Sequence, residues 1–142
     1  MATNNIAADN SDSTERLSAL VARLGAEDVK RTLGGGWTIG FALAHLAFWD
    51  ARQVAALERV ASGEPFPSED LATNAALEAI ADAFNPDTIG QAAVDAARQL
   101  DAVVETLTPD QVGALTGSGK SYAIARAPHR EEHIRQIEDA LG

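Results

Sequence analysis

The fold of this 142-residue chain is best approached from one stretch near its C-terminal end, Pro128-His129-Arg130-Glu131-Glu132-His133-Ile134. The stretch predicts a helix that carries two histidines four residues apart. An α-helix turns by about 100° per residue, so such residues lie about 40° apart on one face and about 6 Å apart along the axis. Two imidazoles at that spacing are able to bind one metal ion.

The third histidine of the chain, His45, falls in a second segment with helical periodicity, 38–60. Thr38 is a suitable N-cap for this helix. The apolar positions that form its predicted core face are Ile39, Leu43, Leu46, Val54 and Leu57. On another side, aromatic residues gather near His45 and predict a pocket wall, with core packing or a dimer interface as the alternative: Phe41, Phe48 and Trp49. Arg52, on the same side, would present a positive charge to an anionic substrate.

Three histidines on two helices predict one metal site formed by His45, His129 and His133. The chain contains no cysteine, so nitrogen and oxygen are the available ligands, and neutral imidazoles favour Zn²⁺ or Ni²⁺. The alternative is that the histidines are exposed or merely packed. Glu132 is expected within about 60° of His129 around the helix, which makes it a candidate proton acceptor. His129-x-x-Glu132-His133 also matches an inverted zinc-protease signature, but the nine residues after His133 leave no room for the further carboxylate ligand of such a site.

The remaining periodicity predicts further helices and no strand. We expect a disordered lead-in over residues 1–11, then a first helix capped by residues 12–14 and ended by Gly25. Another long helix is predicted over 89–107, and the last helix reaches Leu141 from either Tyr122 or Pro128. A short helix is predicted over 74–83. Glycines indicate a loop at 34–36 and a flexible connection over 113–121.

Composition and charge restrict the class of protein. With 46% hydrophobic residues the chain is long enough for one domain over residues 1–142 with its own core. The net charge of -10 opposes a phosphate backbone, so we expect no nucleic-acid partner. Residues 117–121 resemble a phosphate-binding loop, yet Ala114 occupies the position of its first glycine. The sequence has no leader-like N-terminus and no apolar run long enough for a membrane span, and we expect a cytoplasmic protein without membrane contact.

Three short motifs together resemble the DinB-like superfamily of four-helix bundles: Gly36-Trp37-Thr38-Ile39, Ala44-His45-Leu46 and His129-x3-His133-Ile134-x2-Ile137. The resemblance covers nearly the whole chain. It implies an all-α four-helix bundle with up-down-down-up topology, a long crossover and frequent homodimers. It also implies that one histidine of the second helix and a pair of the last helix hold a divalent metal, which maps onto His45, His129 and His133.

The resemblance implies an activity class as well. Characterised members of the family include mycothiol- and bacillithiol-dependent S-transferases, maleylpyruvate isomerases and hydrolases. This chain is short and lacks the C-terminal domain of the isomerases, which favours S-transfer or hydrolysis of a small-molecule substrate with a low-molecular-weight thiol as co-substrate. Glu132 is the candidate proton acceptor, and Arg52 or Arg126 would orient an anionic group. The alternative is a non-catalytic metal-binding or ligand-binding bundle that acts as a homodimer.

Overall fold

The structure is a computed structural model that describes residues 2–68, 73, 77 and 84–142. Helices dominate it, with one short two-stranded hairpin. Its elements in chain order are the helix α1 (Ala2–Arg23), a 3-10 turn (Asp28–Lys30), the strands β1 (Thr32–Gly34) and β2 (Trp37–Thr38), the helices α2 (Ile39–Ala61), α4 (Ile89–Thr106) and α5 (Pro109–Gly117), a second 3-10 turn (Ser121–Ala123), and the helix α6 (Ala127–Leu141). The predicted all-α class is confirmed apart from the hairpin.

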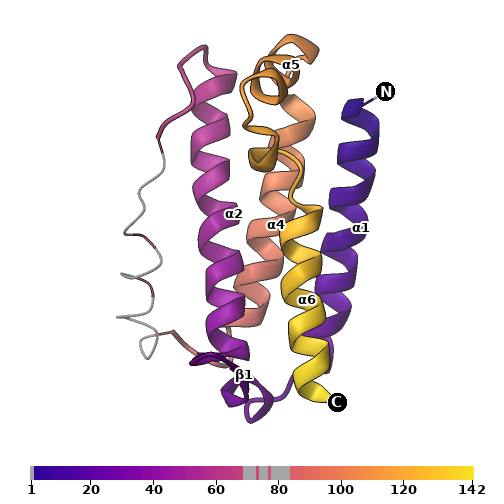
Figure 1. Cartoon of the computed structure of the whole chain (residues 1–142), viewed down its shortest axis with the longest axis vertical. Coiled ribbons are helices and arrows are strands. Elements are labelled where there is room, and N and C mark those ends of the chain that lie inside the picture. The colour runs from indigo at the N-terminus through magenta and orange to yellow at the C-terminus, as the bar shows by residue number, and fades with distance from the viewer. Residues whose placement is uncertain (1, 69–72, 74–76, 78–83) are drawn as a thin grey trace.

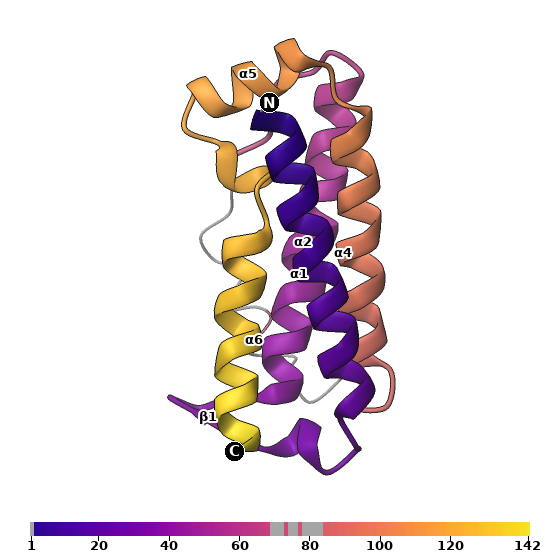
Figure 2. The same cartoon turned by 90° about the vertical axis from the view of Figure 1, so that its right-hand side faces the viewer.

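The long helices α1, α2, α4 and α6 lie side by side (Figures 1 and 2). Neighbouring pairs in contact are α2 with α4, α4 with α1, α1 with α6, and α6 with α2, so the four close around a common interior. In Figure 1, α1 and α6 run downward, whereas α2 and α4 run upward. The connection from α2 to α4 includes the segment 74–83, and the short helix predicted there lies almost entirely outside the described residues.

The interior is filled by the apolar stripes that the periodicity predicts. One cluster of buried residues joins all four long helices: its members include Leu17, Leu20, Leu43, Leu46, Ala93, Ala97, Ile134 and Ile137. A second cluster lies toward α5: its members include Leu57, Leu100, Val104, Leu107, Val112, Leu115 and Ile124. Burial of these side chains is the main stabilising contribution, at about 25 cal/mol per Å² of apolar surface. The first cluster contains residues of both α2 and α6 and so fixes how these two helices face each other.

The N-terminal segment departs from the sequence prediction. α1 begins at Ala2 rather than near Asp12, so the lead-in expected to be disordered over residues 1–11 is helical in its described part. The reason is tertiary. Three polar residues of α1 are at most 2% exposed: Asn10, Ser13 and Thr14. Asn10 donates to the Ile124 carbonyl and Thr14 donates to Asp101 of α4, while Ser13 donates to the Asn10 carbonyl within α1.

The start of α2 agrees with the prediction, but the preceding loop does not fully agree. The Thr38 hydroxyl accepts a hydrogen bond from the Phe41 backbone N–H at 3.0 Å, as expected of an N-cap. Before it, β1 and β2 form an antiparallel hairpin, which corrects the expectation of no strand. The glycines at its turn, 34–36, all have positive φ, between +63° and +91°, which glycine adopts without steric cost. This turn places Trp37 beside the first residues of α2.

The segment between α4 and α6 is also more ordered than expected. Residues 113–117, predicted as part of a flexible connection, belong to α5. Thr108 and Gln111 form a reciprocal capping box at its N-terminus, and this local signal outweighs the helix-weakening effect of Gly113. The last helix begins at Ala127 with Pro128 in its first turn. Within the described residues, no helix is both long and apolar enough to cross a membrane.

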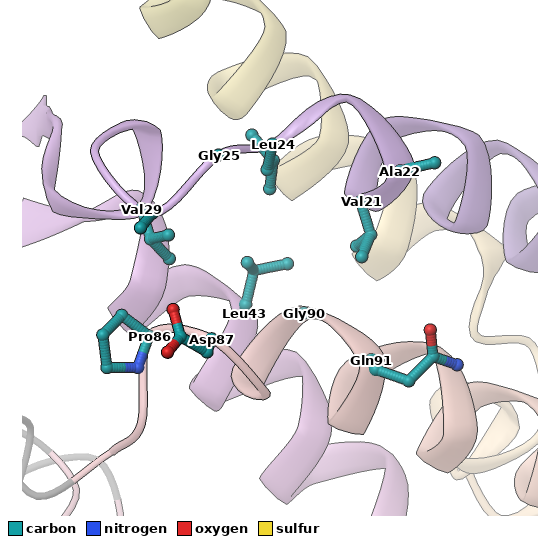
Figure 3. A pocket seen from close by; sticks show the side chains of 11 residues that line it. Val21, Ala22, Leu24, Gly25, Val29, Leu43, Pro86, Asp87, Gly90 and Gln91 are labelled. Atoms are coloured by element: carbon teal, nitrogen blue, oxygen red, sulfur yellow. The ribbon is translucent and has the colours of Figure 1, made fainter.

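A cavity of about 310 Å³ opens near the end of α1, away from the histidines (Figure 3). Val21 of α1 and Leu24, just after that helix, lie on one side of it, and Gly90 and Gln91 of α4 lie on the other. A Cβ atom built on Gly90 would lie 2.8 Å from Val21 Cγ1, which is closer than two carbon atoms pack. Gly90 therefore permits the close approach of α1 and α4 at this end.

Candidate metal centre

The three histidines predicted as ligands converge in the interior between α2 and α6. His45 and His133 are each 6% exposed, and His129, in the first turn of α6, is half-buried. One ring nitrogen from each histidine lies within 4.8 Å of the others, and the Nε2 atoms of His45 and His129 are 3.0 Å apart. Among the described residues this is the group of histidine and carboxylate side chains close enough to share an ion.

The donor set fits a divalent ion of the zinc type. Zn–N bonds of about 2.0–2.1 Å in a tetrahedral arrangement place two ligand nitrogens about 3.3 Å apart. The 3.0 Å spacing between His45 and His129 is close to that value, and the widest spacing of 4.8 Å would close by about 1.5 Å. Three protein ligands leave a position for water or substrate, which is how catalytic zinc sites differ from closed structural ones.

His133 has the hydrogen bond that is usual for a metal-binding histidine. Its Nδ1 lies 2.9 Å from the side-chain oxygen of Gln136, one turn further along α6. An amide oxygen only accepts, so the ring proton is on Nδ1 and Nε2 keeps its lone pair for a ligand bond. Burial lowers the pKa of His133 below its ordinary value of 6.5, and the Gln136 hydrogen bond and the Glu132 charge oppose that shift.

The electrostatic surroundings of His129 keep its imidazole neutral. Burial, followed by the positive charge of Arg126 and then by the neighbouring histidines and Arg130, lowers the pKa of His129 from 6.5 to about 2. The Arg126 guanidinium is the nearest charge, with Nη2 3.1 Å from His129 Nδ1. A neutral imidazole is the protonation state that a ligand requires.

Tryptophan rings pack against two of the three histidines, His45 and His133. The Trp37 ring from β2 stacks on His133 at a centroid distance of 6.0 Å and lies 5.0 Å from His45. Phe41 packs edge-on against Trp37 rather than against a histidine, while Trp49 lies 6.4 Å from His45. An open hollow of about 340 Å³ reaches His133 from the hairpin side, and it is lined by Leu33, Gly34, Gly35, Trp37, His133 and Gln136.

The two residues predicted to assist catalysis lie at the edges of this arrangement. Glu132 is exposed on α6 and acts on His133 through its charge. Arg52 donates to the Gln53 side chain at 3.2 Å and to the backbone oxygens of Pro67 and Ser68 at 3.1 and 2.8 Å, so its described contacts bind it to α2 and to the loop that follows. Arg126, the second arginine considered from the sequence, directly contacts a histidine. Of the two arginines, Arg126 is the better placed.

A buried ion-pair network beside the histidines is absent from the sequence prediction. Asp50 of α2 is fully buried and accepts from Arg126 Nε at 2.9 Å and from Arg130 Nε at 3.0 Å. Arg130 is also fully buried and reaches Asp101 of α4 at 2.9 Å. Two cations and two anions compensate one another, as burial requires. A signal for this network does exist in the sequence, because Asp50 is the one acidic residue between positions 39 and 57, in a segment that is otherwise mostly apolar.

The N-terminus of α6, which carries His129, is held by α1. The Asn10 side chain accepts from the backbone N–H groups of Arg126 and Ala127 at 2.9 and 3.1 Å and donates to the Ile124 carbonyl at 2.6 Å. Arg126, the N-cap residue of α6, makes no capping hydrogen bond with its own side chain. Asn10 therefore does from a distant helix what an N-cap residue normally does locally.

A comparison with known protein families found a match to most of the chain. The family model described as the DinB superfamily matches residues 11–137. No match was found among curated proteins or among solved structures. The matched range includes the three histidines, Asp50 and both buried arginines, so the family resemblance and the geometry of the site concern the same part of the molecule.

Proposed function

Because the chain belongs to the DinB superfamily, we propose that it is a metal-dependent enzyme in which His45, His129 and His133 bind one divalent ion, Zn²⁺ or Ni²⁺. The observation that carries the proposal is the convergence of three ring nitrogens within 4.8 Å in a largely buried setting. We extend the assignment to the up-down-down-up topology with a long crossover, and to a homodimer, both of which follow from the family resemblance.

The proposed reaction is thiol-dependent S-transfer or hydrolysis of a small-molecule substrate. When bound, a divalent ion supplies Lewis acidity and lowers the pKa of a coordinated water or thiol toward neutrality. His133, oriented by Gln136, presents its Nε2 without a proton, and His129 is neutral, which is the charge state that a ligand requires. The hollow lined by Trp37 and His133 offers an approach for the substrate from the hairpin side.

The charged residues near the site are assigned different roles, each from a different observation. Arg126 is assigned to orient an anionic group of the substrate, because its guanidinium lies against His129 and is held by Asp50. Glu132 remains the candidate proton acceptor, since it is exposed to solvent and precedes His133 on α6. Arg52 would serve a substrate that extends toward the loop at Pro67.

The metal is tested with untagged protein, because a histidine tag would outnumber the three histidines of the chain. After chelation and reloading with Zn²⁺ or Ni²⁺, elemental analysis should give about one ion per chain. His45→Ala and His133→Ala should each weaken binding by at least about tenfold. Glu138→Ala, at an exposed position on α6, is the matched control and should bind like the wild type. Absence of stoichiometric metal in the wild type would refute the site.

Catalysis is tested separately by a panel of electrophiles with low-molecular-weight thiols as co-substrates. Turnover by the loaded wild type that is lost in His133→Ala would support the enzyme. Equal turnover in both proteins would refute catalysis at this site. Metal binding without turnover across the panel would favour the non-catalytic bundle. Size-exclusion chromatography with light scattering tests the homodimer, and a monomer at all concentrations would refute that part.

A further inference from the structure

The Arg126 guanidinium makes three directed contacts, and one of them is to a proposed metal ligand. Its Nε donates to Asp50 Oδ1 at 2.9 Å and its Nη1 donates to the Tyr122 carbonyl at 2.8 Å. Its Nη2 lies 3.1 Å from Nδ1 of His129. The Arg126 side chain is 6% exposed, so these contacts are shielded from water and fix the group on three sides. His129 therefore meets a held donor, not a mobile surface charge.

The chemistry of arginine decides the direction of that last hydrogen bond. A guanidinium stays protonated in proteins and has no acceptor atom, so it donates and His129 Nδ1 accepts. A neutral imidazole has one ring proton, which must then be on Nε2. His129 Nε2 lies 3.0 Å from His45 Nε2, to which it donates. The result is a chain of hydrogen bonds with one polarity, from Arg126 through His129 to His45.

This polarity is opposite to the one a metal ligand needs. A histidine that binds an ion through Nε2 has its proton on Nδ1 and donates it to an oxygen, which is the arrangement of His133 with Gln136. At His129, Nδ1 faces a donor instead. The two histidines of α6 thus stand one turn apart with opposite hydrogen-bond directions. A positive guanidinium beside a divalent cation adds like-charge repulsion.

We propose that Arg126 competes with the metal ion for His129. The hydrogen bond from Arg126 Nη2 to His129 Nδ1 and a metal bond from His129 Nε2 exclude each other while the imidazole is neutral. The inference rests on the proposed function. Ion binding releases the Nη2 group of Arg126, which is the group assigned above to an anionic part of the substrate, while Asp50 and Tyr122 continue to hold the rest of the guanidinium. Arg126 thereby lowers the affinity of the site for the ion.

Arg130 provides a matched control for a substitution at Arg126. It donates to the same Asp50 carboxylate through the same atom, Nε, at 3.0 Å, and it is fully buried. Its remaining hydrogen bonds go to α1 and α4: the acceptors are the Asn10 carbonyl, Ser13, Thr14, Asp101 and the Ala97 carbonyl. None of these acceptors is a histidine. Removing Arg130 therefore perturbs the same ion-pair network without removing the donor to His129.

The first test compares Zn²⁺ affinities of the full-length wild type, Arg126→Met and Arg130→Met by competition with a chromophoric chelator. A hydrogen bond from a charged group predicts that Arg126→Met binds Zn²⁺ about tenfold or more tightly than the wild type. Arg130→Met should remain within about threefold of the wild type. Affinity that is unchanged or lower in Arg126→Met overturns the competition. In that case Arg126 stabilises His129 as a metal ligand, as it would if the His129 ring had lost both protons and become an imidazolate anion.

The second test is carried out without metal and does not depend on metal binding by any variant. Long-range proton–nitrogen NMR of chelator-treated wild type, with the His129 signals assigned from His129→Gln, should report the Nε2–H tautomer of His129 and the Nδ1–H tautomer of His133. The Nδ1–H tautomer at His129 would overturn the proposal even if Arg130→Met failed to fold. Lack of Zn²⁺ binding by all three proteins refutes the proposed function together with the competition. Binding by the wild type with no gain in Arg126→Met refutes the competition alone.

Discussion

The contact between Asn10 and the first turn of α6 makes a quantitative prediction for Asn10→Ala. The substitution removes three hydrogen bonds, two accepted from the backbone N–H groups of Arg126 and Ala127 and one donated to the Ile124 carbonyl. At about 1 kcal/mol for each bond, the free energy of unfolding should fall by about 3 kcal/mol. For a chain of this length, that corresponds to a decrease in Tm of about 10 °C.

The matched control is Asn5→Ala on the same helix. Asn5 is exposed, so both substitutions change helix propensity equally while one of them removes the contacts with α6. Asn5→Ala should change the free energy of unfolding by no more than about 0.5 kcal/mol. Urea unfolding followed by far-UV circular dichroism measures both variants. If Asn10→Ala is no more destabilising than Asn5→Ala, then α1 does not hold α6 and the sequence-based expectation of a disordered lead-in is the better description.

Two further predictions concern pH and helix packing. The pKa of His129 is about 2 in the folded protein and about 6.5 in the unfolded chain, so the unfolded chain takes up the proton first as the pH falls. The free energy of unfolding of the metal-free protein should therefore decrease by up to about 1.4 kcal/mol per pH unit below about pH 6.5. Unfolding in urea with chelator between about pH 7 and pH 5 should show a smaller slope in His129→Gln, and an equal slope would contradict the assignment. Gly90→Ala places a Cβ atom 2.8 Å from Val21 Cγ1, and this overpacking should cost about 1–3 kcal/mol, against a gain in helix propensity of about 1 kcal/mol. At Gly113, by contrast, a Cβ atom meets no atom within 4 Å, so Gly113→Ala should stabilise α5 by up to about 1 kcal/mol. Equal thermal shifts in the two glycine variants would show that α1 and α4 are not in close contact at Gly90.

The sequence alone was sufficient for the features that depend on local spacing. His129 and His133 share a helix face because residues four apart must do so in any α-helix. Thr38 caps the following helix because the capping hydrogen bond lies within four residues. The apolar periodicity predicted the core face of α2 for the same reason. These properties need no knowledge of what lies opposite each helix.

The tertiary structure decided which distant polar groups meet. Asn10, Ser13 and Thr14 have side chains that suit a local N-cap equally well, and only the packing of α1 against α6 shows that they bind across the bundle. Likewise, the pairing of Asp50 with two arginines and the stacking of Trp37 on His133 depend on how α2, α6 and the hairpin are rotated about one another. That rotation is set by the whole interdigitated core, and no short stretch of sequence contains it.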